Sequence, residues 1–169
     1  TGLGLLIGVF FGTAALVSPQ AGQLAEQIGW ASSLRLAGAC AVIGLGGMGV
    51  LGGSLLTFAA FLVFGGLASA LGQIASNLAV ARCVRPERQG FVFGLRHASV
   101  PAAALLAGLA VPAIALTVGW RWGFFAGAVF FLLAVFFAAA FLAGAAFFLP
   151  AAFFSVALVT AAVFLRAAV

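Results

Sequence analysis

The sequence predicts an all-α fold, a polytopic transmembrane helix bundle of about six spans. Of the 169 residues, 66% are hydrophobic and 5% are charged, and the mean hydropathy is +1.36. The few charges leave four long runs without any Asp, Glu, Lys or Arg, at 1–25, 36–81, 97–120 and 122–165. A soluble domain could not bury so much apolar surface, so we expect these runs to lie in lipid.

The lengths of the four runs predict the individual spans. A helix rises 1.5 Å per residue, so it needs about 20 residues to cross about 30 Å of hydrocarbon. The first and third runs fit one helix each, whereas the second and fourth are long enough for two helices joined by a turn. We expect one transmembrane domain over 1–169, with spans at about 2–20, 34–52, 54–80, 92–117, 122–143 and 150–167.

Glycine and proline mark the two turns that these spans require, because both residues interrupt helices. Gly52-Gly53-Ser54 lies between the second and third spans, and 144–150, which ends at Pro150, lies between the last two. Small residues also recur at four-residue spacing, which lets helices approach closely. We therefore expect two faces to touch other helices: Gly4, Gly8 and Gly12 on the first span, and Ala68, Gly72 and Ser76 on the third.

The arginines predict the orientation, since short cytoplasmic loops carry an excess of Lys and Arg. Five arginines fall after the first and third spans, on one side of the bundle: Arg35, Arg82, Arg85, Arg88 and Arg96. The other side receives Arg121 and Arg166. We expect the Arg-rich loops to be cytoplasmic, in a bacterial inner (plasma) membrane, with the first residue outside.

The segment between the first two spans resembles a known signature. Gly22, Leu24, Ala25, Glu26 and Gly29 match the loop between helices 2 and 3 of the major facilitator superfamily of transporters. Glu26 takes the place of the usual Asp. The basic residues that normally follow the acid and the second glycine are replaced by Gln27 and Trp30.

Two further segments resemble the same superfamily. Arg85-Pro86-Glu87-Arg88-Gln89-Gly90, followed by Gly94-Leu95-Arg96, is similar to its loop between helices 4 and 5. Gly119-Trp120-Arg121-Trp122 with Phe124 is similar to its outer loop between helices 5 and 6. The resemblance covers about 3–140 and implies helices 2 to 6 of a twelve-helix transporter, followed by one further span. The chain is accordingly expected to be a piece of a longer protein.

A polar stripe on the third span is the candidate substrate site. Ser69, Gln73 and Asn77 are four residues apart, so they share one helical face. Unsatisfied amides are costly in hydrocarbon, so this face should point at another helix or at a water-filled cavity. Both readings stay open: hydrogen bonds between helices, or a cavity lining, which the resemblance favours.

The resemblance also implies a gating role for the signature segment at the cytoplasmic side. Glu26 would pair there with a nearby arginine, for which Arg35, Arg82 and Arg88 are the candidates. His97 is the candidate titrating residue, since it is the side chain near the membrane region that titrates close to neutral pH. A packed or interfacial histidine is the more common alternative.

The sequence therefore predicts a secondary active transporter that moves a small solute by alternating access. Its expected partners are the lipid bilayer and a small-molecule substrate, with a proton as candidate coupling ion, and no nucleic acid. The alternative is a non-transporting membrane scaffold or assembly protein. The chain has no Asp and a single His, which disfavours an enzyme, a metal site and a cofactor.

Overall fold

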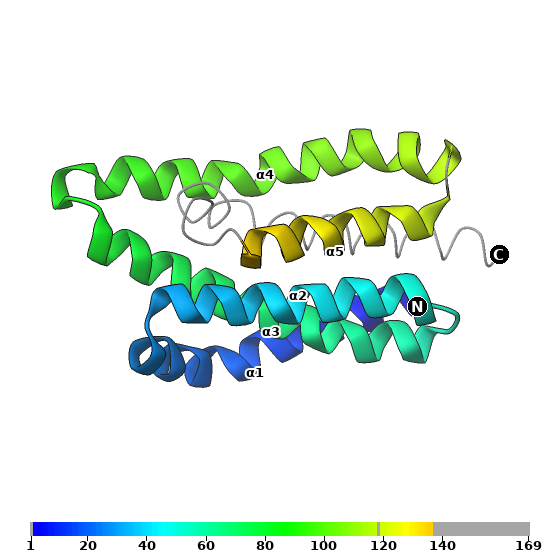
Figure 1. The fold of residues 1–169 in the computed structure, drawn as a ribbon, viewed down its shortest axis with the longest axis horizontal. Helices are drawn as coiled ribbons and strands as arrows, with labels where there is room; N and C mark the ends of the chain where they lie inside the picture. Colours follow the sequence, from blue (N-terminus) through cyan, green and yellow to red (C-terminus); the bar gives the residue numbers. More distant parts are fainter. Residues whose placement is uncertain (1, 118, 137–169) are drawn as a thin grey trace.

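The structure, a computed structural model, describes residues 2–117 and 119–136. This part of the chain forms five helices, α1 (Gly2–Ile28), α2 (Trp30–Leu51), α3 (Leu55–Cys83), α4 (Pro86–Thr117) and α5 (Trp120–Phe136), as Figure 1 shows. The predicted all-α fold is confirmed for these residues. Three of the described helices, α1 to α3, are long and apolar enough to cross a membrane. The sixth predicted span (150–167), the turn at 144–150 and the end of the fifth span (137–143) lie outside the described residues.

The turn predicted at Gly52-Gly53-Ser54 is confirmed. Helix α2 ends at Leu51, and Ser54 caps the start of α3. The Ser54 hydroxyl accepts a hydrogen bond from the backbone N–H of Thr57 at 3.3 Å, and the Thr57 hydroxyl accepts one from the backbone N–H of Ser54 at 3.2 Å. This reciprocal cap satisfies two N–H groups that the first turn of a helix leaves without partners.

Helices α1 and α4 extend beyond the predicted spans. Helix α1 continues past residue 20 to Ile28 because Ala21 and Ala25, one turn apart, are buried in the bundle and hold the last two turns in place. Helix α4 begins at Pro86, six residues before the predicted span. Proline suits the first helical position, and Glu87 in the first turn complements the positive end of the helix dipole.

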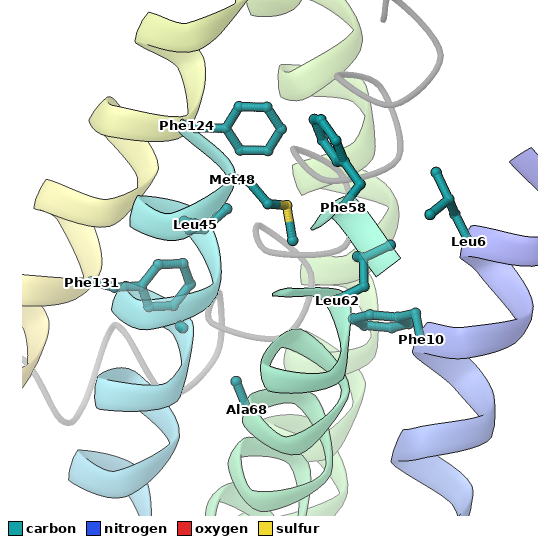
Figure 2. Packing of buried hydrophobic residues seen from close by; sticks show 10 residues of the cluster. Leu6, Phe10, Leu45, Met48, Phe58, Leu62, Ala68, Phe124 and Phe131 are labelled. Carbon is teal, nitrogen blue, oxygen red and sulfur yellow. The ribbon is translucent and has the colours of Figure 1, made fainter. Parts of the chain in front are cut away.

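Helix α3 is the centre of the bundle, with both α1 and α2 packed against it, and α5 packs on α2. Side chains from these four helices form the main apolar cluster (Figure 2). Phe58 of α3 contacts Phe124 of α5 edge to face, with 5.9 Å between the ring centroids. The largest fully buried side chains are Phe58, Phe124, Phe131, Leu45, Met48 and Ser33.

Only one of the two predicted small-residue faces packs against a described helix. Ala68, Gly72 and Ser76 of α3 are buried, as predicted. Gly4, Gly8 and Gly12 of α1 are exposed, and a Cβ atom added at any of them would meet nothing within 4 Å. The expectation that this α1 face touches another helix is therefore wrong for the helices that the structure describes. Instead, α1 turns Leu6 and Phe10 toward α3.

The chain direction brings the arginine-containing connections to one end of the bundle. Helices α1 and α3 run in the same direction, so the corner between α1 and α2 lies at the same end as the connection from α3 to α4 (Figure 1). Arg35, Arg82, Arg85 and Arg88 lie near this end, which we call the arginine end. Arg121 lies in the first turn of α5, at the opposite end. This placement agrees with the shared side that the sequence predicts, while the cytoplasmic location of that side stays a prediction.

Candidate functional site

The polar stripe predicted on α3 divides into a buried part and an open part. Ser69 is buried with 7% of its surface exposed, whereas Gln73 and Asn77 are exposed. Ser76, on an adjacent face, is also buried, and its hydroxyl donates to the backbone carbonyl of Gln73 at 2.9 Å. The structure therefore separates Ser69 from the two amides, which remain on an open face of the helix.

Arg96 of α4 joins this open face of α3. One terminal nitrogen of its guanidinium donates to the side-chain oxygen of Asn77, and the other donates to the backbone carbonyl of Gln73 at 3.3 Å. The side chain of Arg96 is half-buried. The Arg96 guanidinium thus bridges the side chain of Asn77 and the backbone of Gln73 across two helices. We call the surface formed by Arg96, Asn77 and Gln73 the α3–α4 polar face.

This position of Arg96 differs from the prediction, which groups Arg96 with the arginines of the connecting loops. A signal was present, because Arg96 falls inside the predicted span 92–117. A charged residue within a span needs a polar partner and marks a candidate functional site. The polar stripe on α3 offers neutral hydrogen-bonding partners, but only the tertiary structure shows that Arg96 meets this stripe.

The residues of the signature segment form a helix end and a tight corner rather than a loop. Gly22, Leu24, Ala25 and Glu26 lie on the last two turns of α1, and Gly29 alone separates α1 from α2. Gly29 has a φ angle of 82°, a left-handed conformation that favours glycine. Its N–H donates to the carbonyl of Ala25 at 3.1 Å, and its own carbonyl accepts from the Ser33 hydroxyl at 2.9 Å.

Glu26 is exposed on the last turn of α1, close to the start of α2. A carboxylate at a helix C-terminus opposes the helix dipole, whereas the N-terminus of a following helix attracts it. The three candidate partners, Arg35, Arg82 and Arg88, are exposed near the same end. Among the described residues, Glu26 and these three arginines lie at the same end of the bundle, and no ion pair joins them.

The connection from α3 to α4 is held by the side chain of Gln89, for which the sequence alone predicts no role. The Gln89 amide donates to the carbonyls of Ala81 at 3.4 Å and Val84 at 3.1 Å. These carbonyls lie at the end of α3, where backbone acceptors lack helical partners. Gln89 therefore fixes the start of α4 against the end of α3, close to Arg82 and Arg88.

The remaining candidate, His97, is exposed on α4 next to Arg96. No group of three His, Cys, Asp or Glu side chains that could hold a metal ion occurs within 2–117 and 119–136. The chemistry that the described site offers is hydrogen bonding and positive charge, from the guanidinium of Arg96 and the amides of Gln73 and Asn77.

Comparisons of the chain with protein-family models, with curated proteins and with solved structures found no match.

Proposed function

We propose that this chain is part of a secondary active transporter that moves a small solute across the bacterial inner membrane by alternating access. The supporting observation is the α3–α4 polar face, where Arg96 of α4 meets Asn77 and the carbonyl of Gln73 on α3. Charged and amide groups at membrane depth are costly and are retained chiefly along substrate and ion paths. The resemblance of Gly22–Gly29 to the superfamily signature supports the same class of function.

The test of this proposal is transport by the purified protein. The intact protein is reconstituted into liposomes, and uptake of a panel of radiolabelled small solutes is followed with and without a proton gradient. A gradient-dependent uptake that empty liposomes lack is the expected result. If the protein is folded and no solute accumulates, the transport proposal fails.

A membrane scaffold is the second candidate, and the same contact gives it a specific argument. The Arg96 hydrogen bonds link α4 to α3, and α4 packs less extensively on the other described helices than α1 and α2 pack on α3. A hydrogen bond that only joins two membrane helices contributes about 0.6–2 kcal/mol. The two functions therefore differ in whether removing these side chains changes solute binding or only stability.

The expected orientation is checked by cysteine labelling. Cys83 is exposed at the end of α3, and Cys40 is half-buried in α2. If the arginine end is cytoplasmic, a membrane-impermeant thiol reagent should label Cys83 only after intact cells are permeabilised. The Cys83→Ser variant identifies the labelled residue, and rapid labelling of Cys83 in sealed cells would reverse the orientation.

Glu26 should act as a latch at the arginine end. We expect Glu26→Gln to slow transport about two- to fivefold, since a carboxylate near an arginine or a helix N-terminus contributes about 0.3–1 kcal/mol to one conformation. Solute affinity in the absence of turnover should stay close to that of the unmodified protein. Transport rates and equilibrium binding of the purified protein measure the two effects.

Glu87→Gln is the matched control for this experiment. Glu87 is the other acidic residue of the chain and lies exposed in the first turn of α4. Its replacement removes the same charge from the same end of the bundle. Equal effects of the two substitutions, or full transport by Glu26→Gln, would rule out a specific latch.

A further inference from the structure

The segment that joins α3 to α4 projects from the arginine end and concentrates positive charge there. In Figure 1 this connection extends beyond the corner between α1 and α2. Three exposed arginines lie on it: Arg82 in the last turn of α3, Arg85 in the connection and Arg88 in the first turn of α4. Glu87 is the only acidic residue of the segment, so three arginines against one glutamate leave a net charge of +2 over 82–88. We call 82–88 the basic turn.

Hydrogen bonds hold the basic turn in one conformation. The side-chain amide of Gln89 donates to the carbonyls of Ala81 and Val84, each of which directly precedes an arginine of the turn. The backbone N–H of Arg88 donates to the carbonyl of Arg85 at 2.9 Å. The backbone beside all three arginines is therefore fixed. A binding surface that is already ordered loses less conformational entropy when a ligand binds.

Exposed apolar side chains continue the surface from the basic turn along α4. Phe91 is 77% exposed and Leu95 is 55% exposed. They follow Arg88 by three and seven residues, so the three side chains share one face of the helix. Along the helix axis, Phe91 lies about 4.5 Å and Leu95 about 10 Å beyond Arg88. A positive charge is thus followed by an apolar surface in the direction of the uncharged run that begins at residue 97.

The contact between α3 and α4 sets the depth of this surface. Arg96 of α4 donates to Asn77 of α3, and the two helices run in opposite directions (Figure 1). Five residues before Arg96, Phe91 therefore lies about level with Arg82, where the uncharged run of α3 ends. Leu95 lies about 6 Å farther in, beside the apolar part of α3. The arginines thus lie at the rim of the apolar region, and the two apolar side chains lead from the rim inward.

This order of groups matches an anionic phospholipid. The phosphate of a lipid headgroup accepts two parallel hydrogen bonds from a guanidinium, and basic residues next to a membrane helix attract anionic headgroups. The acyl chains can cover the apolar side chains that the described helices leave exposed. An acidic protein would match the arginines alone, because a partner outside the membrane does not reach the apolar side chains below the rim.

We propose that the basic turn, Phe91 and Leu95 form a binding surface for anionic phospholipids. The arginines bind the headgroup phosphate, and the two apolar side chains contact the acyl chains. The surface is separate from the α3–α4 polar face, and it would anchor a transporter and a scaffold alike.

The first measurement is lipid binding by the intact protein, purified in a neutral detergent. Phosphatidylglycerol and phosphatidylcholine with the same acyl chains are titrated in, and binding is followed by native mass spectrometry and by thermal unfolding. We expect phosphatidylglycerol to bind about tenfold more tightly than phosphatidylcholine and to raise Tm. Arg82→Gln, Arg85→Gln and Arg88→Gln should each lower this preference severalfold, and the triple variant should abolish it. If the triple variant does not fold, the single variants decide the question.

Matched variants separate the two halves of the surface. Phe91→Ser removes an apolar contact that both lipids share, so it should weaken the binding of both and leave their ratio unchanged. Because Phe91 is exposed, this variant should keep its Tm in the absence of lipid. Arg35→Gln removes the same charge from an exposed position of α2 at the arginine end, and it should leave the preference nearly unchanged. Equal losses in Arg35→Gln and Arg88→Gln would mean diffuse attraction and overturn the proposed site.

Two soluble probes test the other possible occupants. Stabilisation by glycerol 3-phosphate that matches that of phosphatidylglycerol and needs the same arginines would show a soluble-anion site and overturn the lipid assignment. Binding of a polyglutamate peptide through these arginines, without a preference for phosphatidylglycerol, would indicate an acidic protein partner and also overturn it. Equal affinity of the unmodified protein for the two lipids would contradict the proposal directly.

Discussion

Replacing Gly66 with alanine should lower the free energy of unfolding by about 1–3 kcal/mol, because it overpacks the contact between α1 and α3. Gly66 is buried in α3, and a Cβ atom there would lie 2.8 Å from the backbone carbonyl oxygen of Phe10 and 2.8 Å from the Cβ of Thr13. The carbonyl belongs to helix α1 and cannot turn aside as a side-chain end can. The helices must therefore separate. The higher helix propensity of alanine offsets this loss of folding free energy by about 1 kcal/mol at most.

The measurement is thermal unfolding of the purified protein in detergent, followed by the loss of helical circular dichroism. A fall in Tm of several degrees is expected for Gly66→Ala. Gly8→Ala is the control, since Gly8 is an exposed glycine of α1 around which a Cβ atom meets nothing within 4 Å. This control should keep or slightly raise Tm. Equal Tm values for the two variants would mean that α1 and α3 do not pack through Gly66.

Replacing Gln73 with alanine should change the apparent affinity for the transported solute severalfold, up to about tenfold, without loss of stability. This magnitude corresponds to one hydrogen bond of about 0.5–1.5 kcal/mol. The side chain of Gln73 is exposed, and Arg96 binds its backbone carbonyl rather than its amide. The substitution thus keeps that contact between α3 and α4 and removes only a group of the α3–α4 polar face.

Asn77→Ala is the matched comparison, because the Asn77 side chain itself accepts a hydrogen bond from Arg96. If the face lines a solute path, this substitution should also change affinity, and water in the path should replace much of the lost contact. If the face only joins two helices, Asn77→Ala should lower stability by about 0.6–2 kcal/mol and Gln73→Ala should have no effect on stability. Binding and thermal unfolding of both variants separate the two functions. Unchanged affinity in both would remove the solute path from α3.

The helix boundaries of this protein depend partly on local sequence and partly on tertiary packing. Glycine and serine at 52–54 predicted the turn between α2 and α3, because the turn depends on local chemistry that the structure shows as the Ser54 cap. The ends of α1 and α4 were predicted less well. The last turns of α1 hold because Ala21 and Ala25 pack against other helices, and neighbours in space are not visible in a sequence.

The faces of the helices show the same limit. Ser69, Gln73 and Asn77 lie on one side of α3, as their four-residue spacing predicts. Such a side is a stripe about 100° wide, and a neighbouring helix can cover the stripe at one residue and leave it open at the next. Ser69 is buried, and the two amides are exposed. On α1, the glycine spacing predicts that the glycine face is packed. The described helices instead cover the side of α1 that carries Leu6 and Phe10.

The sequence by itself determined the all-helical class, the apolar character of the helices, the turn at Gly52–Ser54 and the grouping of Arg35, Arg82, Arg85 and Arg88 at one end. These follow from composition, run length and the alternation of chain direction. Only the tertiary structure decided which helical faces are buried and that Arg96 meets Asn77. Membrane-type helices are apolar on nearly all sides, so periodicity does not indicate the covered side, and contacts between distant residues depend on how whole helices pack.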